Sequence, residues 1–397
     1  MRRRRWSDLP KDLLREIAGH LHVASDFVSF HAVCKPWRSS HDPTTGMVNT
    51  TDQLLPWLLA PNKQYDGSLE LRCVFSKSNY LVRPAITGRG RNWVASADGT
   101  GVCYFVSDFL YGPTLHDPFT GAPLTLLPLL FGGLWKEQNP FGIIYSDGTI
   151  LLYIAYYIKY GAMAEVTAAL LSPGDDNWTV IQRKLESPSR NYREMCIAYH
   201  AGNILVTVGR SVLQVITPTK TASDDVVVLG PSSMPPPQYS HVLESRGELL
   251  WVLVYVSMEF KDQRRKRGHG LLGVTSMSVY ALKHAPAPHW ARKEDNSLAD
   301  RVLFLGSPNS IALDATQLGM AGGFVYFMYD VDEDKDTVSC LPPGRRGVFK
   351  YNLINNTTMF VDWLPKGRKG WFDDELYTWL IPQPIIGPIQ GSPSTPI

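Results

Sequence analysis

The sequence repeats one local pattern five times: a short polar turn is followed by a run of β-branched and aromatic residues. The turns contain Gly99, Gly148, Gly202, Gly247 and Gly323, which are 49, 54, 45 and 76 residues apart. The runs that follow them read VCYFV, ILLYI, ILVTV, LLWVLVYV and FVYFMY. Such runs between turn residues are typical of β-strands, and a period of about 40–50 residues with several strands in each repeat is typical of propeller blades.

A single repeat of this kind cannot cover both faces of its own sheet. Neighbouring repeats have to pack on one another, and closure into a ring protects the outer edges of the sheets. We therefore expect residues 54–382 to form a β-propeller of five to seven blades, with the longest gap holding an insertion or a further blade. A pair of β-sandwiches is the alternative architecture for the same strands.

The first 40 residues show helical periodicity instead. Pro10 suits the first turn of a helix, and apolar residues then recur at positions 13, 14, 17, 18 and 21. A second helix can begin at Ser25 or Asp26, which are good N-caps, and end before Pro36. A unit of this size buries too little surface to be comfortably stable alone, so we expect its remaining apolar stripe to bind a partner. The chain is thus expected to be mainly β, with a small all-α domain at residues 6–40.

Residues 8–40 resemble the F-box family. They read L-P-x-D-L-L-x-E-I, then a spaced aspartate, then V-C-x-x-W-R. The resemblance implies docking on a Skp-type adaptor, which connects the chain to a cullin-based ubiquitin ligase. It places the adaptor contacts, or the residues that support them, at Leu9, Pro10, Leu13, Leu14, Ile17 and Leu21. It assigns the packing of the hairpin and its exposed edge to Val33, Cys34 and Trp37. The alternative is a helical hairpin that caps the downstream domain.

The remainder resembles a plant family whose C-terminal region is known as domain of unknown function 295, a KIB-like propeller. The segments that carry this resemblance are LLPWLLAP at 54–61, LFLGSPNSIALDA at 303–315, the following GGFVYF and the late LYTWLIP. Together the two resemblances imply a plant F-box protein whose propeller presents a substrate.

The sequence contains no motif that marks a catalytic or metal site. H-E-x-x-H, G-x-S-x-G and the P-loop pattern are absent, and the five cysteines are far apart with no C-x-x-C pair. The aspartates at 330, 332, 334 and 336 alternate as in a calcium loop, but Lys335 stands where glycine is required and Leu341 where the bidentate glutamate belongs. We expect a solvated hairpin tip there, and no cofactor.

Two basic runs stand out in a chain whose net charge is only +2. They are Arg2, Arg3, Arg4 and Arg5, and Arg264, Arg265, Lys266 and Arg267. Each could direct nuclear import or form a solvated tail or loop. Without a general basic excess or interleaved aromatics, nucleic-acid binding is not expected. The longest apolar run, at 150–158, is far shorter than the ~20 residues of a membrane span. We expect no membrane association and a location in the nucleus, the cytoplasm or both.

These features predict a non-catalytic adaptor. The order of domains would be a basic tail at 1–5, the F-box at 6–40, a linker at 41–53, the propeller at 54–382 and a Pro/Gly/Ser-rich tail at 383–397. The leading hypothesis is the substrate-recognition subunit of an SCF-type (Skp-cullin-F-box) E3 ubiquitin ligase, which holds an unidentified protein substrate. The alternative is an F-box protein that acts as a non-proteolytic scaffold or blocker of its partner. A third hypothesis, a radical-copper oxidase housed in a propeller, needs a Tyr/His constellation that no spacing in the sequence marks.

Overall fold

The structure is a computed structural model that describes a little over three fifths of the chain. The described residues are 6, 9–38, 40, 54–61, 69–82, 93–108, 112–118, 122–126, 140–157, 163–186, 195–208, 212–218, 225–228, 239–256, 275–284, 288–331, 345–364 and 377–382.

Three short helices open the chain: α1 (Lys11–Gly19), α2 (Ala24–Ala32) and α3 (Lys35–Arg38). The predicted first helix is present, with Pro10 as its N-cap. The second helix begins earlier than expected, because Val23 rather than Ser25 or Asp26 is its N-cap. The second helix ends before Pro36, as expected, with Ala32 as its last residue. Pro36 lies in the first turn of α3, where proline is tolerated.

The first sheet joins the two ends of the β-rich body. Its strands, in spatial order, are β25 (Thr378–Leu380), β1 (Trp57–Pro61), β2 (Leu69–Cys73) and β3 (Ser78–Val82). β25 pairs antiparallel with β1, with Trp379 opposite Leu58. The last described strand of the chain therefore completes the sheet of the first, which closes the ring.

The second sheet has eight strands, which form two antiparallel meanders joined side by side. One meander contains β4 (Trp93–Ser96), β5 (Val102–Asp108), β6 (Gly112–His116) and β7 (Pro123–Leu126). The other contains β8 (Phe141–Ile144), β9 (Ile150–Tyr157), β10 (Met163–Leu171) and β11 (Thr179–Glu186). A short parallel pairing of β4 with β8, with Val94 opposite Gly142, connects the two meanders.

The next two sheets are regular four-stranded meanders. The third sheet contains β12 (Ile197–His200), β13 (Asn203–Val208), β14 (Val212–Ile216) and β15 (Asp225–Val228). The fourth contains β16 (Tyr239–Ser245), β17 (Glu248–Val256), β18 (Thr275–Lys283) and β19 (His289–Arg292).

The fifth sheet has five strands and explains the longest gap between the turn glycines. A 3-10 helix, η4 (Asp295–Leu298), leads into it. Its strands, in spatial order, are β21 (Ile311–Asp314), β20 (Arg301–Phe304), β22 (Phe324–Val331), β23 (Arg345–Asn352) and β24 (Thr357–Trp363). β20 runs parallel to β22, so the pair β20 and β21 is an insertion before the strand that follows Gly323.

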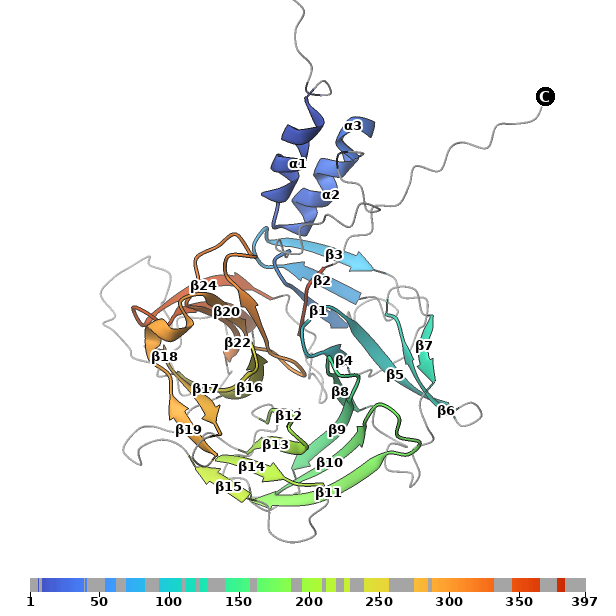
Figure 1. Cartoon of the computed structure of the whole chain (residues 1–397), viewed down its shortest axis with the longest axis vertical. Helices are drawn as coiled ribbons and strands as arrows, with labels where there is room; N and C mark the ends of the chain where they lie inside the picture. The colour runs from blue at the N-terminus through green and yellow to red at the C-terminus, as the bar shows by residue number, and fades with distance from the viewer. Residues whose placement is uncertain are drawn as a thin grey trace, which may run out of the picture.

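The sheets are arranged around a common centre, so the mainly β propeller is confirmed and a pair of sandwiches is not observed (Figure 1). The expected five to seven separate blades differ slightly from the observed pairing. The described strands form five sheets, of which three have four strands, one has eight and one has five. All five turn glycines have positive φ, between 74° and 87°, a backbone conformation that glycine adopts without steric cost.

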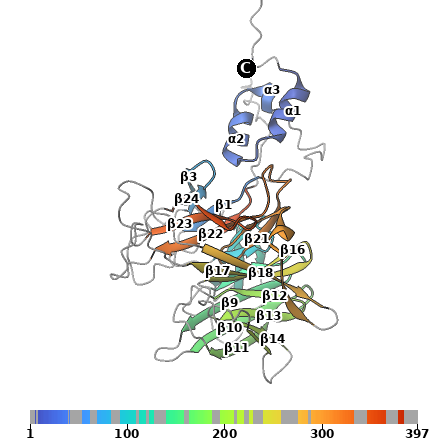
Figure 2. The same ribbon diagram turned by 90° about the vertical axis from the view of Figure 1, so that its left-hand side faces the viewer.

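Large apolar clusters fill the spaces between neighbouring sheets. One cluster joins the fourth and fifth sheets and includes Val252, Phe327 and Tyr351. Another joins the fifth and first sheets and includes Phe304 and Trp379. Such packing of sheet on sheet gives the ring a continuous core. The three helices stand outside this ring, beside the sheet that contains β1, β2 and β3 (Figures 1 and 2).

Candidate functional site

The N-terminal helices have a small core of their own. Leu14 and Ala18 of α1 and Phe30 of α2 are buried, and Leu9, Leu21 and Trp37 pack against them while half-buried. The rings of Phe30 and Trp37 have their centroids 4.6 Å apart. Leu14, Ala18 and Leu21 follow the spacing i, i+4, i+7, so they form one stripe of α1 that faces inward.

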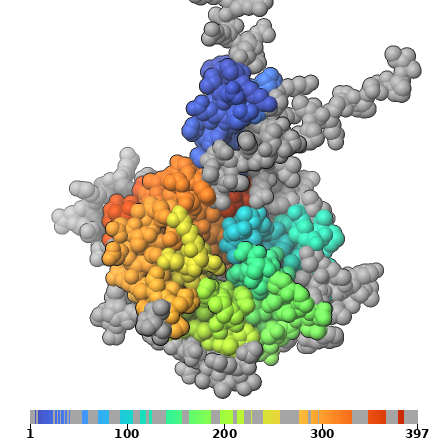
Figure 3. All heavy atoms as spheres, viewed as in Figure 1, coloured from blue at the N-terminus to red at the C-terminus, as the bar shows by residue number. Residues whose placement is uncertain are grey.

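A second apolar stripe of α1 faces solvent. It consists of Pro10, Leu13 and Ile17, which follow the spacing i, i+3, i+7, and we call these three residues the α1 face. Pro10 is exposed, and Leu13 and Ile17 keep 47% and 40% of their surface accessible. A helix that caps the propeller would bury this stripe against it. The α1 face stays open to solvent instead, and the helices project from the body (Figure 3).

The other predicted residues lie around the end of α2 and in α3. Val33, at the end of α2, is 57% exposed, whereas Cys34 is half-buried. Trp37 is half-buried in the helical core. The nine residues assigned from the F-box resemblance thus divide into exposed ones, which are Pro10, Leu13, Ile17 and Val33, and buried or half-buried ones, which are Leu9, Leu14, Leu21, Cys34 and Trp37. Their assignment to adaptor binding stays a prediction.

Trp6 is a candidate contact that the sequence analysis did not identify. Its indole is 77% exposed, the largest exposed fraction among the large apolar side chains described. Its backbone is fixed, because its carbonyl accepts a hydrogen bond from Trp37 Nε1 at 3.1 Å. An exposed tryptophan on an anchored backbone is a common hot spot of protein interfaces. A lone tryptophan three residues before the Leu-Pro pair was the signal that could have found it.

The polar rim of the α1 face is charged and solvated. Asp12 and Arg15 form an exposed ion pair, with Arg15 Nη1 3.1 Å from Asp12 Oδ1. Lys11 and Glu16 are also exposed. An apolar centre with charged residues at its edge is the usual composition of a protein–protein interface.

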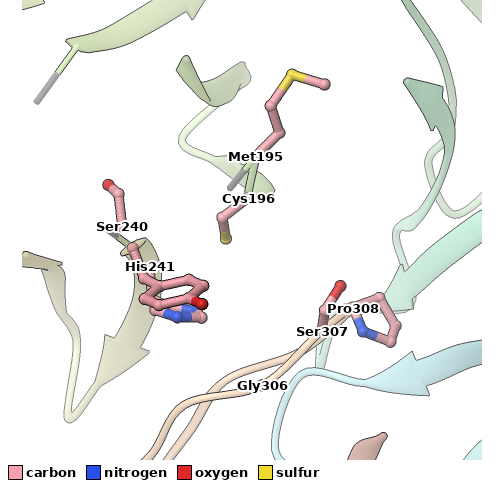
Figure 4. A pocket seen from close by; sticks show the side chains of 8 residues that line it. Met195, Cys196, Ser240, His241, Gly306, Ser307 and Pro308 are labelled. Atoms are coloured by element: carbon pink, nitrogen blue, oxygen red, sulfur yellow. The ribbon is translucent and has the colours of Figure 1, made fainter. Parts of the chain in front are cut away.

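A second site lies inside the propeller, where three parts of the chain line a small pocket (Figure 4). Its walls are Met195, Cys196, Tyr239, Ser240, His241, Gly306, Ser307 and Pro308. The cavity volume is about 20 Å³, which holds roughly one water molecule.

Cys196 and His241, which line this pocket, are both uncharged at neutral pH. Burial raises the pKa of the Cys196 thiol to about 11, so it is protonated at neutral pH. Burial lowers the pKa of His241 to about 4, so its imidazole is neutral. Ser310 Oγ lies 3.3 Å from His241 Nδ1 and holds the ring in place. The pocket therefore presents a neutral ring and a protonated thiol rather than a thiolate nucleophile.

The described residues contain no group of three or more His, Cys, Asp or Glu side chains placed to hold a metal ion. No helix among them is long and apolar enough to cross a membrane.

Several predicted features lie outside the described part of the chain. They are the basic runs at Arg2–Arg5 and Arg264–Arg267, the aspartates at 332, 334 and 336, the linker at 41–53 and the tail at 383–397.

Comparison with known proteins identifies the propeller. Residues 64–352 match the family model described as KIB1-4 beta-propeller. A comparison with curated proteins finds no match. The F-box and the plant origin remain predictions, whereas the expected KIB-like propeller is confirmed.

Among solved structures, one similar chain is a protein of unknown function from Bacteroides caccae, with 14% identity, coverage of 66% of this chain and 92% of that chain, and a TM-score of 0.29. A putative 6-phosphogluconolactonase from Bacteroides fragilis has 13% identity, coverage of 79% and 83%, and a TM-score of 0.35. The WD40 domain of SCAP from fission yeast has 10% identity, coverage of 77% and 84%, and a TM-score of 0.27. Likenesses this weak carry no argument about function. The family model, which matches well over half of the chain, shows that the protein belongs to the KIB1-4 beta-propeller family.

Proposed function

We propose that this chain is the substrate-recognition subunit of an SCF-type E3 ubiquitin ligase. In this proposal the N-terminal helices dock on a Skp-type adaptor, and the propeller holds a protein substrate for ubiquitination by a separate enzyme. The observation that carries the proposal is the exposure of Leu13 and Ile17 on a helix whose other apolar stripe is already buried. Membership in the KIB1-4 beta-propeller family supports a protein-interaction role for the larger domain.

The magnitude of the hydrophobic effect indicates how large the docking surface has to be. Full burial of a Leu or Ile side chain is worth about 1.5–3 kcal/mol, so burying the remaining exposed part of Leu13 and Ile17 contributes about 1 kcal/mol each. A micromolar complex needs roughly 8 kcal/mol. The α1 face alone is therefore too small, and the interface has to extend to other exposed side chains, of which Trp6 before α1 and Val33 at the end of α2 are the most exposed large apolar ones described in the N-terminal unit.

No reactive side chain is needed for this function. A receptor that holds the substrate beside a bound enzyme raises the effective concentration of the reacting groups, and this alone accelerates transfer. The neutral His241 and the protonated Cys196 of the inner pocket are consistent with a binding role for the propeller.

The proposal is tested by capture of a purified Skp-type adaptor on the full chain. We expect the wild-type chain to retain the adaptor and the double variant Leu13→Asp/Ile17→Asp to lose it, because two carboxylates in an apolar interface cost several kcal/mol. Leu124→Asp is the matched control, since Leu124 is an exposed leucine of β7 on the propeller. Equal retention by the double variant and the wild type would remove the proposal.

The non-proteolytic alternative shares the same docking surface and differs in the fate of the bound partner. Deletion of residues 1–40 separates the two. A ligase receptor loses the ubiquitin load and the short half-life of its partner on deletion, whereas a blocker changes the activity of its partner with or without these residues.

A further inference from the structure

In the part of the chain that the structure describes, the turn between α1 and α2 contacts the propeller. The carbonyl of His22 accepts a hydrogen bond from the backbone N–H of Leu55, at 2.7 Å. Leu55 is buried and lies two residues before β1, so this bond ties the helical turn to the start of the first sheet. The views in Figures 1 and 2 agree that the helices meet the body at this end.

Val23 anchors the same turn in the apolar core of the propeller. It packs against the cluster of Trp57 and Cys73 in the first sheet. It also packs against the large cluster that joins the first and fifth sheets. A helix N-cap is usually Ser, Thr, Asp or Asn, and a valine there gives the helix no side-chain cap. Val23 therefore stabilises the contact with the propeller and does not stabilise the N-terminus of α2 through its side chain.

The side chain of His22 lies against the backbone of Gly319 in the propeller. Gly319, in the turn between β21 and β22, has a φ of +61°. A Cβ atom at Gly319 would lie 2.1 Å from Nε2 of His22, far inside van der Waals contact. The imidazole therefore rests directly on the glycine backbone, and any side chain at this position would push the ring away.

We infer that the His22–Val23 turn is a positioning device that fixes the orientation of the α1 face relative to the propeller. The contact involves neither Leu13 nor Ile17, so docking to the propeller and docking to an adaptor do not compete. This inference deepens the proposed function: a fixed orientation sets the direction in which the propeller presents its substrate to the ligase. Only that consequence depends on the proposed function, because the junction exists in the free chain.

The test measures the distance between spin labels at Arg15 of α1 and Asp175 of the propeller in the full chain. Both sites are exposed, and labels carried on an unnatural amino acid leave the native cysteines unchanged. We expect a single narrow distance distribution for the wild type and a broad one for Gly319→Ala. In the double variant His22→Ala/Gly319→Ala the clash is removed, so the distribution should become narrower than in Gly319→Ala alone. A merely structural defect at Gly319 would not be rescued in this way.

Val23→Ser provides a second route to the same result without altering the body of the propeller. It should broaden the distribution, whereas Val180→Ser, at an exposed valine of β11, should leave it narrow. A broad distribution in the wild type, or a narrow one in both Gly319→Ala and Val23→Ser, would overturn the inference. Adaptor capture, measured on the same unlabelled variants, should stay within about twofold of the wild type. Absence of capture by the wild type together with a narrow distribution would refute the proposed function and leave the positioning device intact.

Discussion

Leu13 and Leu14 are neighbours in the sequence, yet 47% of one side chain is exposed and only 1% of the other. Successive residues of an α-helix point about 100° apart, so two adjacent leucines can serve two different surfaces. Leu14 joins the core of the helical unit, whereas Leu13 belongs to the α1 face.

Alanine substitutions should separate these two roles. Leu14→Ala removes a fully buried side chain and should destabilise the helices by about 2–5 kcal/mol. Leu13→Ala removes an exposed one and should change their stability by less than about 0.5 kcal/mol. Hydrogen exchange of residues 11–19, followed by mass spectrometry, measures the difference. Equal exchange in the two variants would contradict the assignment of Leu14 to the core.

The ring closure depends on a buried amide. Asn309 donates to the carbonyl of Ser96 at 3.0 Å, and its Oδ1 accepts a hydrogen bond from Thr378 Oγ1 at 2.6 Å. These contacts connect the loop before β21 with β4 and with the closing strand β25. Asn309→Ala leaves buried partners without a hydrogen bond, and we expect a loss of about 3 kcal/mol in the free energy of unfolding, measured by urea denaturation.

Thr378→Val supplies the control for this contact. If Asn309 and Thr378 stabilise the ring through their mutual hydrogen bond, the effects of the two substitutions should be less than additive in the double variant. Full additivity would show that the two side chains act independently.

His241 should make the stability of the propeller depend on pH. Its pKa is lowered by burial to about 4, from 6.5 in the unfolded chain, so between these values the unfolded state binds more protons than the folded state. Stability therefore falls as the pH falls from 6.5 toward 4, by about 2 kcal/mol between pH 7 and pH 5. Thermal unfolding of the wild type and of His241→Asn across this range measures the effect.

In that comparison the stability of the His241→Asn variant should depend much less on pH than that of the wild type. The same change at His289, an exposed histidine of β19, should leave the pH dependence of stability unchanged. An unchanged pH dependence in His241→Asn would show that this imidazole is not held neutral by burial.

Glu248 joins the fourth and fifth sheets through a charge network. Its carboxylate accepts hydrogen bonds from Lys293 at 2.7 Å and Lys283 at 3.1 Å, and Arg301 lies 3.4 Å away. The hydrogen bond from Lys293 is the main cause that lowers the pKa of Glu248 to about 2, from an ordinary value of 4.5. The contribution is present above pH 4.5 and lost as the pH falls toward 2.

Glu248→Gln should therefore lower the free energy of unfolding by about 1 kcal/mol at pH 7, the size expected of a solvated ion-pair network. The gap between variant and wild type should be much smaller at pH 2.5, because most of the pH window between 4.5 and 2 in which this contribution is lost has then been crossed. Chemical denaturation at the two pH values measures this. A gap of the same size at pH 2.5 and pH 7 would assign the effect to packing rather than charge.

Much of the fold could be predicted from the sequence, because turns and helices are determined by residues that lie close together along the chain. The turn glycines could be recognised in the sequence because each precedes a run of apolar residues. In the structure each has a positive φ, which glycine adopts without steric cost. The helical periodicity around Leu14 and Ile17 was equally visible. Pairing between strands was not, since the parallel contact of Val94 with Gly142 depends on how two distant meanders pack. Nothing local in the sequence marks these two residues as partners.

The residues of the candidate site could be predicted from the sequence, but which of them are exposed and which are buried could not. Both Leu13 and Leu14 were assigned to one stripe, and only their environments separate the contact residue from the core residue. Val23 was missed because a valine between two helices resembles ordinary loop sequence. Its role depends on the sheets of the propeller, which lie far from it along the chain.

Binding of the α1 face to a Skp-type adaptor can be measured by calorimetric titration of the purified full chain with such an adaptor. We predict a one-to-one complex with a negative heat-capacity change, as expected when apolar surface is buried. Affinity should fall at least a hundredfold in Leu13→Asp/Ile17→Asp and stay unchanged in Leu124→Asp. Absence of binding by the wild type, or equal affinity for all three proteins, would show that the α1 face is not an adaptor-docking surface.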